Sequence, residues 1–233
     1  MMPRPAPEAL RRYHASGQWG TRTIAQCIAE QVAPRGDKLA ITDNGERALS
    51  YAELDAQAAR LAGFFSRQGI VRGDVITLHL PNRCEAAVVT LAAWRLGAVL
   101  HPAAPAYGRQ DLAHGLARCG SKAIVVAARF RGTDYTETLH RLRSEDGIAP
   151  LALVIGQGAR KVGIDFDDAL AAAPLARAVA GDADDAAAVL FTSGTESRPK
   201  GVVHTHNTLL FGERAVAAAL GLDAADRCFM ASP

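Results

Sequence analysis

Short apolar runs alternate with longer amphipathic stretches through the middle of the chain. The runs are residues 75–80, 98–100, 123–127, 151–155 and 186–190. Runs of this length, bounded by turn residues, are typical of buried strands, and the stretches between them have helical spacing of apolar residues. Strands that alternate with helices form βαβ units around a parallel sheet. The pattern therefore predicts an α/β fold with a mainly parallel sheet and flanking helices.

Helix starts are marked by capping residues. Thr23 with Gln26 and Ser50 with Glu53 each have the spacing of a capping box, so a helix is expected after each pair. Asn82 and Asn207 are expected to cap two further helices that end near residues 96 and 220. Other helices are predicted at residues 111–117, 135–143 and 165–173.

Three segments of the chain lie outside this alternation. A hairpin is expected where residues 39–43 and 47–49 flank an Asn-Gly pair, and a last strand is expected at residues 226–230. Residues 1–20 are expected to be a loosely held arm. Residues 174–185, which include Asp182, Asp184 and Asp185, are expected to be an exposed acidic linker.

Composition excludes several classes of protein. A net charge of +2 with both signs interspersed gives no stripe for nucleic acid, and 49% hydrophobic residues allow a large core. No apolar run reaches the roughly 20 residues that a membrane span needs. The four cysteines are scattered, which is typical of a reducing compartment. These features predict a soluble cytoplasmic protein.

Candidate chemistry is concentrated in residues 191–201, directly after an apolar run. This stretch combines glycines, hydroxyl side chains and Lys200, which together can surround a phosphate group. It differs from the motif G-x-x-x-x-G-K-[ST] because Pro199 and the β-branched residues after it favour strand–loop–strand over a helix. The alternative, a polar hairpin without a ligand, stays open on composition alone.

The same stretch resembles the phosphate-binding signature of the adenylate-forming enzymes, the superfamily of acyl-CoA synthetases, adenylation domains and luciferases. The family form is Y-T-S-G-T-T-G-x-P-K-G-V, and here the chain has FTSGTESRPKGV, followed by the family-like THN at residues 205–207. Further similar motifs occur in order along the chain: LSYAEL at 49–54, GDV at 73–75 with LPN at 80–82, AWRLGAV at 93–99 and PAAPAY at 102–107.

The resemblance implies the N-terminal portion of an ATP-dependent carboxylic acid–CoA ligase, with ATP, Mg²⁺ and CoA as cofactors and a small carboxylic acid as substrate. Residues 21–233 would be an incomplete AMP-binding domain without the C-terminal domain. Lys200 and Thr192 would be catalytic, Thr192 would also bind Mg²⁺, and the nucleotide phosphates would contact residues of the loop: Thr192, Ser193, Gly194, Thr195, Glu196, Ser197 and Lys200.

Two loop residues depart from the family form. Glu196 and Ser197 stand where Thr and Gly are usual, and Glu196 is expected to face solvent or to pair with Arg198 or Lys200. The G-T-E-S form and residues 130–135 are similar to relatives that activate medium-chain, alicyclic or aromatic acids, which links the chain to fatty acid metabolism.

Several alternatives stay open at this stage. The alternatives to a CoA ligase are an adenylating module that loads a carrier protein and a non-catalytic truncated remnant. The motifs for adenine, ribose and the later catalytic Lys are not found, so the chain alone is expected to be inactive and to expose apolar surface. Homo-oligomerisation also stays open. His204 and His206, spaced to share a strand face, are expected to be structural, as are His79 and His101.

Overall fold

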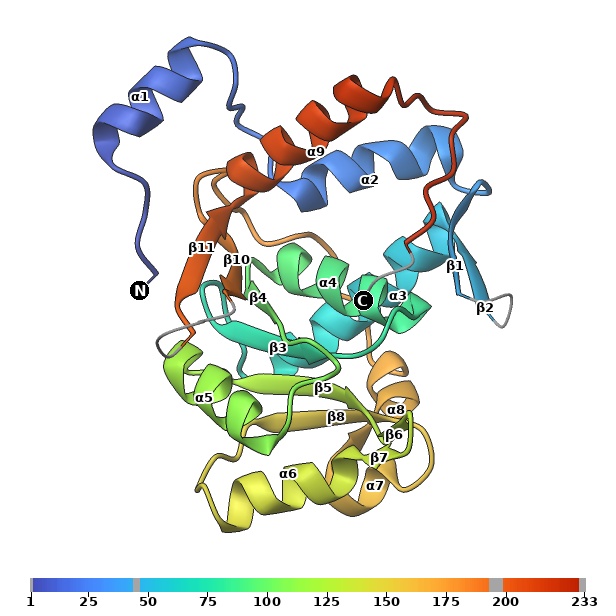
Figure 1. Ribbon diagram of the computed structural model, residues 1–233. Helices are drawn as coiled ribbons and strands as arrows, with labels where there is room; N and C mark the ends of the chain where they lie inside the picture. Colours follow the sequence, from blue (N-terminus) through green and yellow to red (C-terminus); the bar gives the residue numbers. More distant parts are fainter. Residues whose placement is uncertain (1, 44–46, 193–198, 231–233) are drawn as a thin grey trace.

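The computed structural model describes residues 2–43, 47–192 and 199–230. Its centre is a seven-stranded sheet with the order β11-β10-β4-β3-β5-β8-β9 (Figure 1). Neighbouring strands are parallel except for β10 and β11, which are antiparallel. The predicted α/β architecture with a mainly parallel sheet is confirmed. The strands are β1 (Leu39–Asp43), β2 (Arg47–Ser50), β3 (Val75–His79), β4 (Val99–Pro102), β5 (Ala123–Ala127), β6 (Arg129–Phe130), β7 (Thr133–Asp134), β8 (Leu151–Ile155), β9 (Ile164–Asp165), β10 (Ala186–Phe191) and β11 (Gly201–Thr205).

Helices cover both faces of the sheet. They are α1 (Pro7–Ala15), α2 (Ile24–Arg35), α3 (Tyr51–Arg67), α4 (Cys84–Leu96), α5 (Arg109–Cys119), α6 (Tyr135–Ser144), α7 (Ala159–Val162), α8 (Phe166–Leu170) and α9 (His206–Leu220). Alternate residues of β5 belong to different cores: Val125 packs with α3, α4 and α8, whereas Ile124 packs with α5, α6 and α7. This double coverage explains why β3 and β5 are buried along their whole length.

Two predicted caps are wrong, and each correction has a physical reason. Helix α4 begins after Arg83, and the Asp43 carboxylate of β1 accepts a hydrogen bond from the Cys84 N–H at 2.8 Å. The long-range carboxylate therefore takes the place that was expected for Asn82. Helix α9 is capped by Thr205, whose hydroxyl accepts from the Thr208 N–H at 3.1 Å.

The predicted strand at residues 226–230 is also wrong. This segment is irregular, and Phe229 is 90% exposed. Within the described part of the chain no strand lies beside it to complete a ladder, so its apolar pattern alone does not make a strand. Helix α9 exposes Phe211, Val216 and Leu220 as well. The expected exposed apolar surface is therefore present.

The segment at residues 1–20 is more ordered than the expected loose arm. It contains α1, which projects from the body of the molecule (Figure 1). Trp19 is 8% exposed and its ring stacks on Tyr13 with a centroid distance of 4.7 Å. His14 Nε2 lies 2.8 Å from a carboxylate oxygen of Asp184. Polar and aromatic contacts thus attach the segment to the domain. Among the described residues, no helix is long and apolar enough to cross a membrane.

Candidate functional site

The β10–β11 hairpin brings Thr192 and Lys200 together at the neck of its loop. The two strands pair antiparallel, with Phe191 opposite Gly201. The Thr192 N–H donates to the Lys200 carbonyl oxygen at 3.0 Å, and the Thr192 hydroxyl lies 3.5 Å from the same oxygen. Both residues are exposed. The predicted strand–loop–strand form is confirmed, while Ser193, Gly194, Thr195, Glu196 and Ser197 lie outside the described residues.

The C-terminal end of β10, which Thr192 follows, lies at the same edge of the sheet as the carboxyl ends of the central strands, because β10 runs parallel to β4. The chain passes from β3 to β4 on one side and then to β5 on the other side of β3. Connections that leave in opposite directions open a crevice at the carboxyl ends of β3 and β5, which is where open α/β sheets bind ligands. The order of strands therefore predicts a ligand site between these two strand ends.

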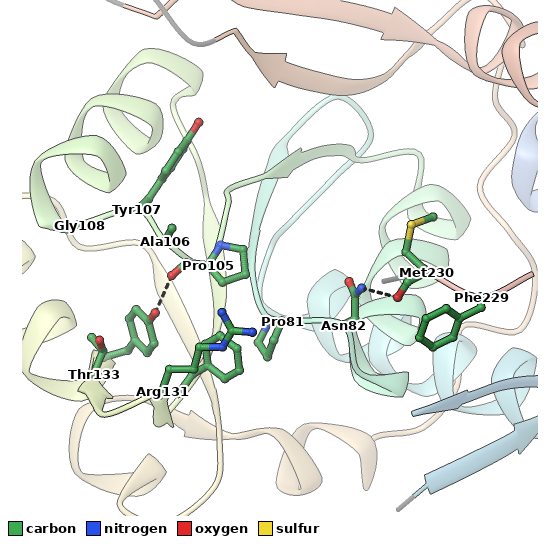
Figure 2. Close-up of a pocket in the computed structure, with 12 residues that line it drawn as sticks. Pro81, Asn82, Pro105, Ala106, Tyr107, Gly108, Arg131, Thr133, Phe229 and Met230 are labelled. Carbon is green, nitrogen blue, oxygen red and sulfur yellow. Dashed lines mark hydrogen bonds between the residues drawn. The ribbon is translucent and has the colours of Figure 1, made fainter. Parts of the chain in front are cut away.

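A pocket of about 540 Å³ lies at this point (Figure 2). Segments that follow β3, β4 and β5 line it, together with the last described residues, Phe229 and Met230. Three stretches that are far apart in the sequence meet here: Pro81 and Asn82, the 105–108 turn, and residues 130–135. The Asn82 side-chain amide donates to the Met230 carbonyl oxygen at 3.3 Å.

The pocket combines aromatic walls with one cationic side chain. The Tyr135 hydroxyl donates to the Pro105 carbonyl oxygen at 2.7 Å and so ties the turn after β4 to α6. The Arg131 guanidinium lies over the Phe130 ring, 5.2 Å from its centroid. Arg131 is the only non-glycine residue of the described chain with a positive φ, +47°. Backbone strain of this kind is concentrated at functional sites. The sequence motifs that contain these residues indicated a family but did not predict a pocket. The pocket becomes evident only from the convergence of three turns at one edge of the sheet.

Three buried histidines are held neutral: His79 and His101 in the central strands, and His206 at the start of α9 on the opposite edge of the sheet. Burial lowers the pKa of His101 to about 4, with the nearby His79 adding to the effect, and burial also lowers the pKa of His79. Burial lowers the pKa of His206 to about 4 as well. All three rings are buried, and the structural role expected for them stays a prediction. His204 and His206 do not share a strand face, however, because His206 begins α9.

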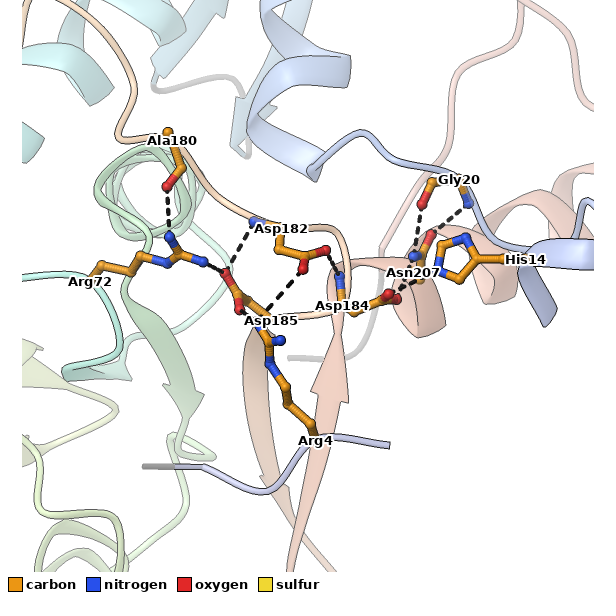
Figure 3. A network of polar contacts seen from close by, with 9 residues as sticks. All are labelled: Arg4, His14, Gly20, Arg72, Ala180, Asp182, Asp184, Asp185 and Asn207. Atoms are coloured by element: carbon orange, nitrogen blue, oxygen red, sulfur yellow. Dashed lines mark hydrogen bonds and ion pairs between the residues drawn. The ribbon is translucent and has the colours of Figure 1, made fainter. Parts of the chain in front are cut away.

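Most of residues 174–182 are exposed, as expected for a linker, but the end of this acidic segment, residues 183–185, is a structured anchor. Asp185 binds Arg4 and Arg72, and Asp184 binds His14 and the side-chain amide of Asn207 (Figure 3). Although burial acts to raise it, the pKa of Asp185 is lowered by hydrogen bonds from the Asp182 N–H and the two guanidinium groups. These carboxylates serve to fix the start of β10, and they do not form a catalytic cluster.

Among the described residues, the Thr192 hydroxyl is the side chain at this edge that the sequence proposed as a metal ligand. Among the residues that the structure describes, no group of three His, Cys, Asp or Glu side chains could hold a metal ion. Mg²⁺ needs few protein ligands when phosphate oxygens and water complete its octahedron. The exposed Thr192 hydroxyl is a donor of the kind that such a substrate-bound ion accepts.

The fold is an α/β domain with a pocket at the carboxyl edge of its mainly parallel sheet. Residues 28–233 match the family of AMP-binding enzymes. The chain is 34% identical over 232 residues to the medium-chain fatty-acid–CoA ligase of Escherichia coli strain K12, which covers 95% of this chain and 39% of the relative. It is 33% identical over 230 residues to the salicyl-AMP ligase/salicyl-S-ArCP synthetase of Mycobacterium tuberculosis, which covers 97% and 40% respectively.

Among solved structures, the apo structure of Mycobacterium smegmatis MbtA superposes with a TM-score of 0.86 at 26% identity, covering 97% of this chain and 41% of that chain. The chain therefore belongs to the AMP-binding, adenylate-forming enzyme family. It spans about 40% of the length of the curated relatives that it matches. Relatives include both CoA ligases and an enzyme named for loading a carrier protein.

Proposed function

We propose that this chain supplies the triphosphate-binding part of an ATP-dependent carboxylic acid–CoA ligase. In that reaction a carboxylate oxygen attacks the α-phosphorus of ATP, and the bond to the β-phosphate oxygen breaks to give an acyl-adenylate and pyrophosphate. A thiol then attacks the acyl carbon and AMP leaves. The observation that carries the proposal is the neck of the β10–β11 loop, where Thr192 and Lys200 lie together at the ligand-binding edge of the sheet.

The neck residues have distinct roles in this proposal. The Lys200 ammonium offsets the charge of the β- and γ-phosphates, which is a charge-assisted contact of about 1.5–3 kcal/mol. The Thr192 hydroxyl binds the Mg²⁺ that accompanies ATP. The loop residues Ser193, Gly194, Thr195, Glu196 and Ser197 complete the phosphate contacts. Positioning and charge neutralisation of this kind provide most of the catalysis in phosphoryl displacement.

The pocket between the ends of β3 and β5 supports a small-molecule partner. Its aromatic walls and the Arg131 guanidinium suit an organic molecule that carries a negative charge. A carboxylic acid and the phosphate-bearing CoA thiol both have this chemistry. We therefore place one of the two organic substrates of the ligase beside this surface.

The second candidate function is loading of a carrier protein. It is favoured by the 33% identity to an enzyme named salicyl-S-ArCP synthetase, which is close to the 34% identity to the CoA ligase. A third candidate is a non-catalytic chain that keeps only the fold. The CoA ligase and the carrier-loading enzyme differ in the thiol that accepts the acyl group. Both differ from the non-catalytic chain in that they form an acyl-adenylate.

The assay is exchange of labelled pyrophosphate into ATP with a panel of medium-chain, alicyclic and aromatic acids. We propose that the 233-residue chain alone gives no exchange, because it spans only about 40% of the length of the curated relatives that it matches. A longer polypeptide that continues this sequence is expected to give exchange, followed by thioester formation with CoA. Exchange followed by loading of a carrier protein only would support the second candidate, and no exchange by either would refute the ligase proposal.

A further inference from the structure

The ring of Phe191 lies between two histidine rings at the end of β10. The His101 ring meets it edge-on at a centroid distance of 5.1 Å, and the His114 ring does so at 5.9 Å. His101 comes from β4 and His114 from α5, so two separate elements hold one side chain. Phe191 immediately precedes Thr192, the first residue of the loop neck.

His101 is itself fixed on two sides. Its Nδ1 lies 3.0 Å from the Thr77 hydroxyl, which is 2.7 Å from the Ser121 hydroxyl. On the other side the ring contacts the backbone of Gly115 in α5, where a Cβ atom would lie 2.6 Å from His101 Cε1. The ring is 1% exposed. His101 therefore has little freedom to follow Phe191 if that side chain moves.

The opposite strand leaves room for the same ring. Gly201 pairs with Phe191 across the hairpin, and a Cβ atom on Gly201 would lie 3.5 Å from Phe191 Cζ and 3.0 Å from Val189 Cγ1. A Cβ atom at this position would therefore be in ordinary contact with the Phe191 ring and in tight contact with Val189. Gly201 thus leaves open space on the side of the Phe191 ring that faces β11.

We propose that His101 and His114 form a seat for Phe191, and that this seat positions the loop neck for phosphate binding. The inference rests on the proposed function of the loop. A seated Phe191 fixes the peptide that follows it, and the Thr192 N–H can then remain bonded to the Lys200 carbonyl oxygen. A loop with a fixed neck loses less conformational freedom when it binds a ligand. All three side chains act through the loop and are positioning residues.

The competing interpretation is that the three rings only fill the core. Two observations argue for the seat. Neither His101 Nε2 nor His114 Nε2 has a hydrogen-bond partner among the described residues, so one buried nitrogen of each ring lacks the contact that usually accompanies burial. Phe191 is also only half buried, although the His101 ring that it contacts is 1% exposed.

The variants Phe191→Leu and His114→Leu test the seat, since both keep an apolar volume and remove an aromatic partner. Phe191→Tyr is the conservative rescue. Val203→Ala, in the same hairpin but outside the seat, is the matched control for general destabilisation. Because His114 is partly exposed, the His114→Leu variant is expected to fold.

The first readout is hydrogen exchange of the Thr192 amide by NMR, which needs no ligand. Phe191→Leu and His114→Leu are expected to speed this exchange by about tenfold relative to the Val189 amide, because they release the neck without unfolding β10. Phe191→Tyr and Val203→Ala are expected to leave the ratio unchanged. An unchanged ratio in Phe191→Leu, with only a lower melting temperature, would show that the rings serve packing alone and would overturn the seat.

The second readout is the Kd of the full chain for Mg·ATP by calorimetry. The two leucine variants are expected to weaken binding by about tenfold and the two comparison variants by less than about twofold. Faster exchange together with unchanged affinity would overturn the link between the seat and phosphate binding. Faster exchange in a chain whose wild type does not bind Mg·ATP would support the seat as a structural device and refute the proposed function instead.

Discussion

Asn207 pairs with the backbone of Gly20 through two hydrogen bonds. Its side-chain oxygen accepts from the Gly20 N–H at 2.9 Å, and its amide nitrogen donates to the Gly20 carbonyl oxygen at 3.0 Å. The same nitrogen donates to an Asp184 carboxylate oxygen at 2.8 Å (Figure 3). Asn207 is 1% exposed. One buried amide therefore joins the N-terminal segment, the acidic anchor and the start of α9.

Replacement of Asn207 by Ala is expected to lower the free energy of unfolding by about 2–4 kcal/mol, because the backbone of Gly20 and the Asp184 carboxylate lose buried partners. Asn207→Asp should be at least as harmful, since it places a second carboxylate beside Asp184. Urea unfolding measures both. Gln18→Ala, at an exposed position two residues before Gly20, is the control and should cost less than about 0.5 kcal/mol. An Asn207→Ala cost no larger than that of the control would contradict this account.

Because His101 and His206 are buried, we expect the free energy of unfolding to be lower in mild acid. The unfolded chain takes up protons near pH 6.5, whereas the folded chain does not until about pH 4, because burial lowers the pKa of both rings. Unfolding therefore binds protons between these values, and the free energy of unfolding falls as the pH is lowered from about 6.5 to about 4.

The slope of unfolding free energy against pH measures this effect. Each such histidine contributes at most about 1 kcal/mol per pH unit in the window between its two pKa values. His206→Leu is expected to reduce the slope by about that amount. Equal slopes in wild type and His206→Leu would show that His206 titrates normally in the folded protein.

Two glycines in helices are expected to respond oppositely to replacement by alanine: one variant should lower the free energy of unfolding and the other should raise it. Gly115→Ala is expected to destabilise the protein by about 1–3 kcal/mol, since the new Cβ would lie 2.6 Å from His101 Cε1 in a packed core. Gly212→Ala in α9 meets nothing within 4 Å and should stabilise by about 0.5–1 kcal/mol through helix propensity. Thermal unfolding of both variants measures these two changes in stability. A neutral Gly115→Ala would mean that the contact between α5 and β4 is loose.

The sheet was predictable because its signals are local. Buried strands at residues 123–127 and 151–155 are apolar at every position, and the structure has β5 and β8 with these bounds. The capping boxes of α2 and α3 are likewise complete within four residues, and both are present. Hydrophobic period and capping chemistry suffice for such elements.

The errors occur where a distant partner decides the structure. Asp43 supplies a hydrogen bond to the start of α4 that neighbouring residues could not reveal. The carboxylates near residue 185 look solvated in sequence, yet arginines at positions 4 and 72 bind them. The pocket was not predicted because it forms only when the turns after β3, β4 and β5 meet. The family resemblance singled out Thr192 and Lys200 as candidate site residues. The hydrogen bond between their backbones follows from the register of β10 and β11.

The central claim is that the β10–β11 loop binds phosphate. Titration of the full chain with Mg·ATP tests phosphate binding at this loop directly. Wild type should bind with saturation, and Lys200→Ala should weaken binding by about tenfold or more, because a charge-assisted contact is lost. Lys161→Ala, at another exposed lysine, should bind as wild type. If Lys200→Ala binds Mg·ATP as tightly as wild type, or if wild type does not bind it, the proposed phosphate site is wrong.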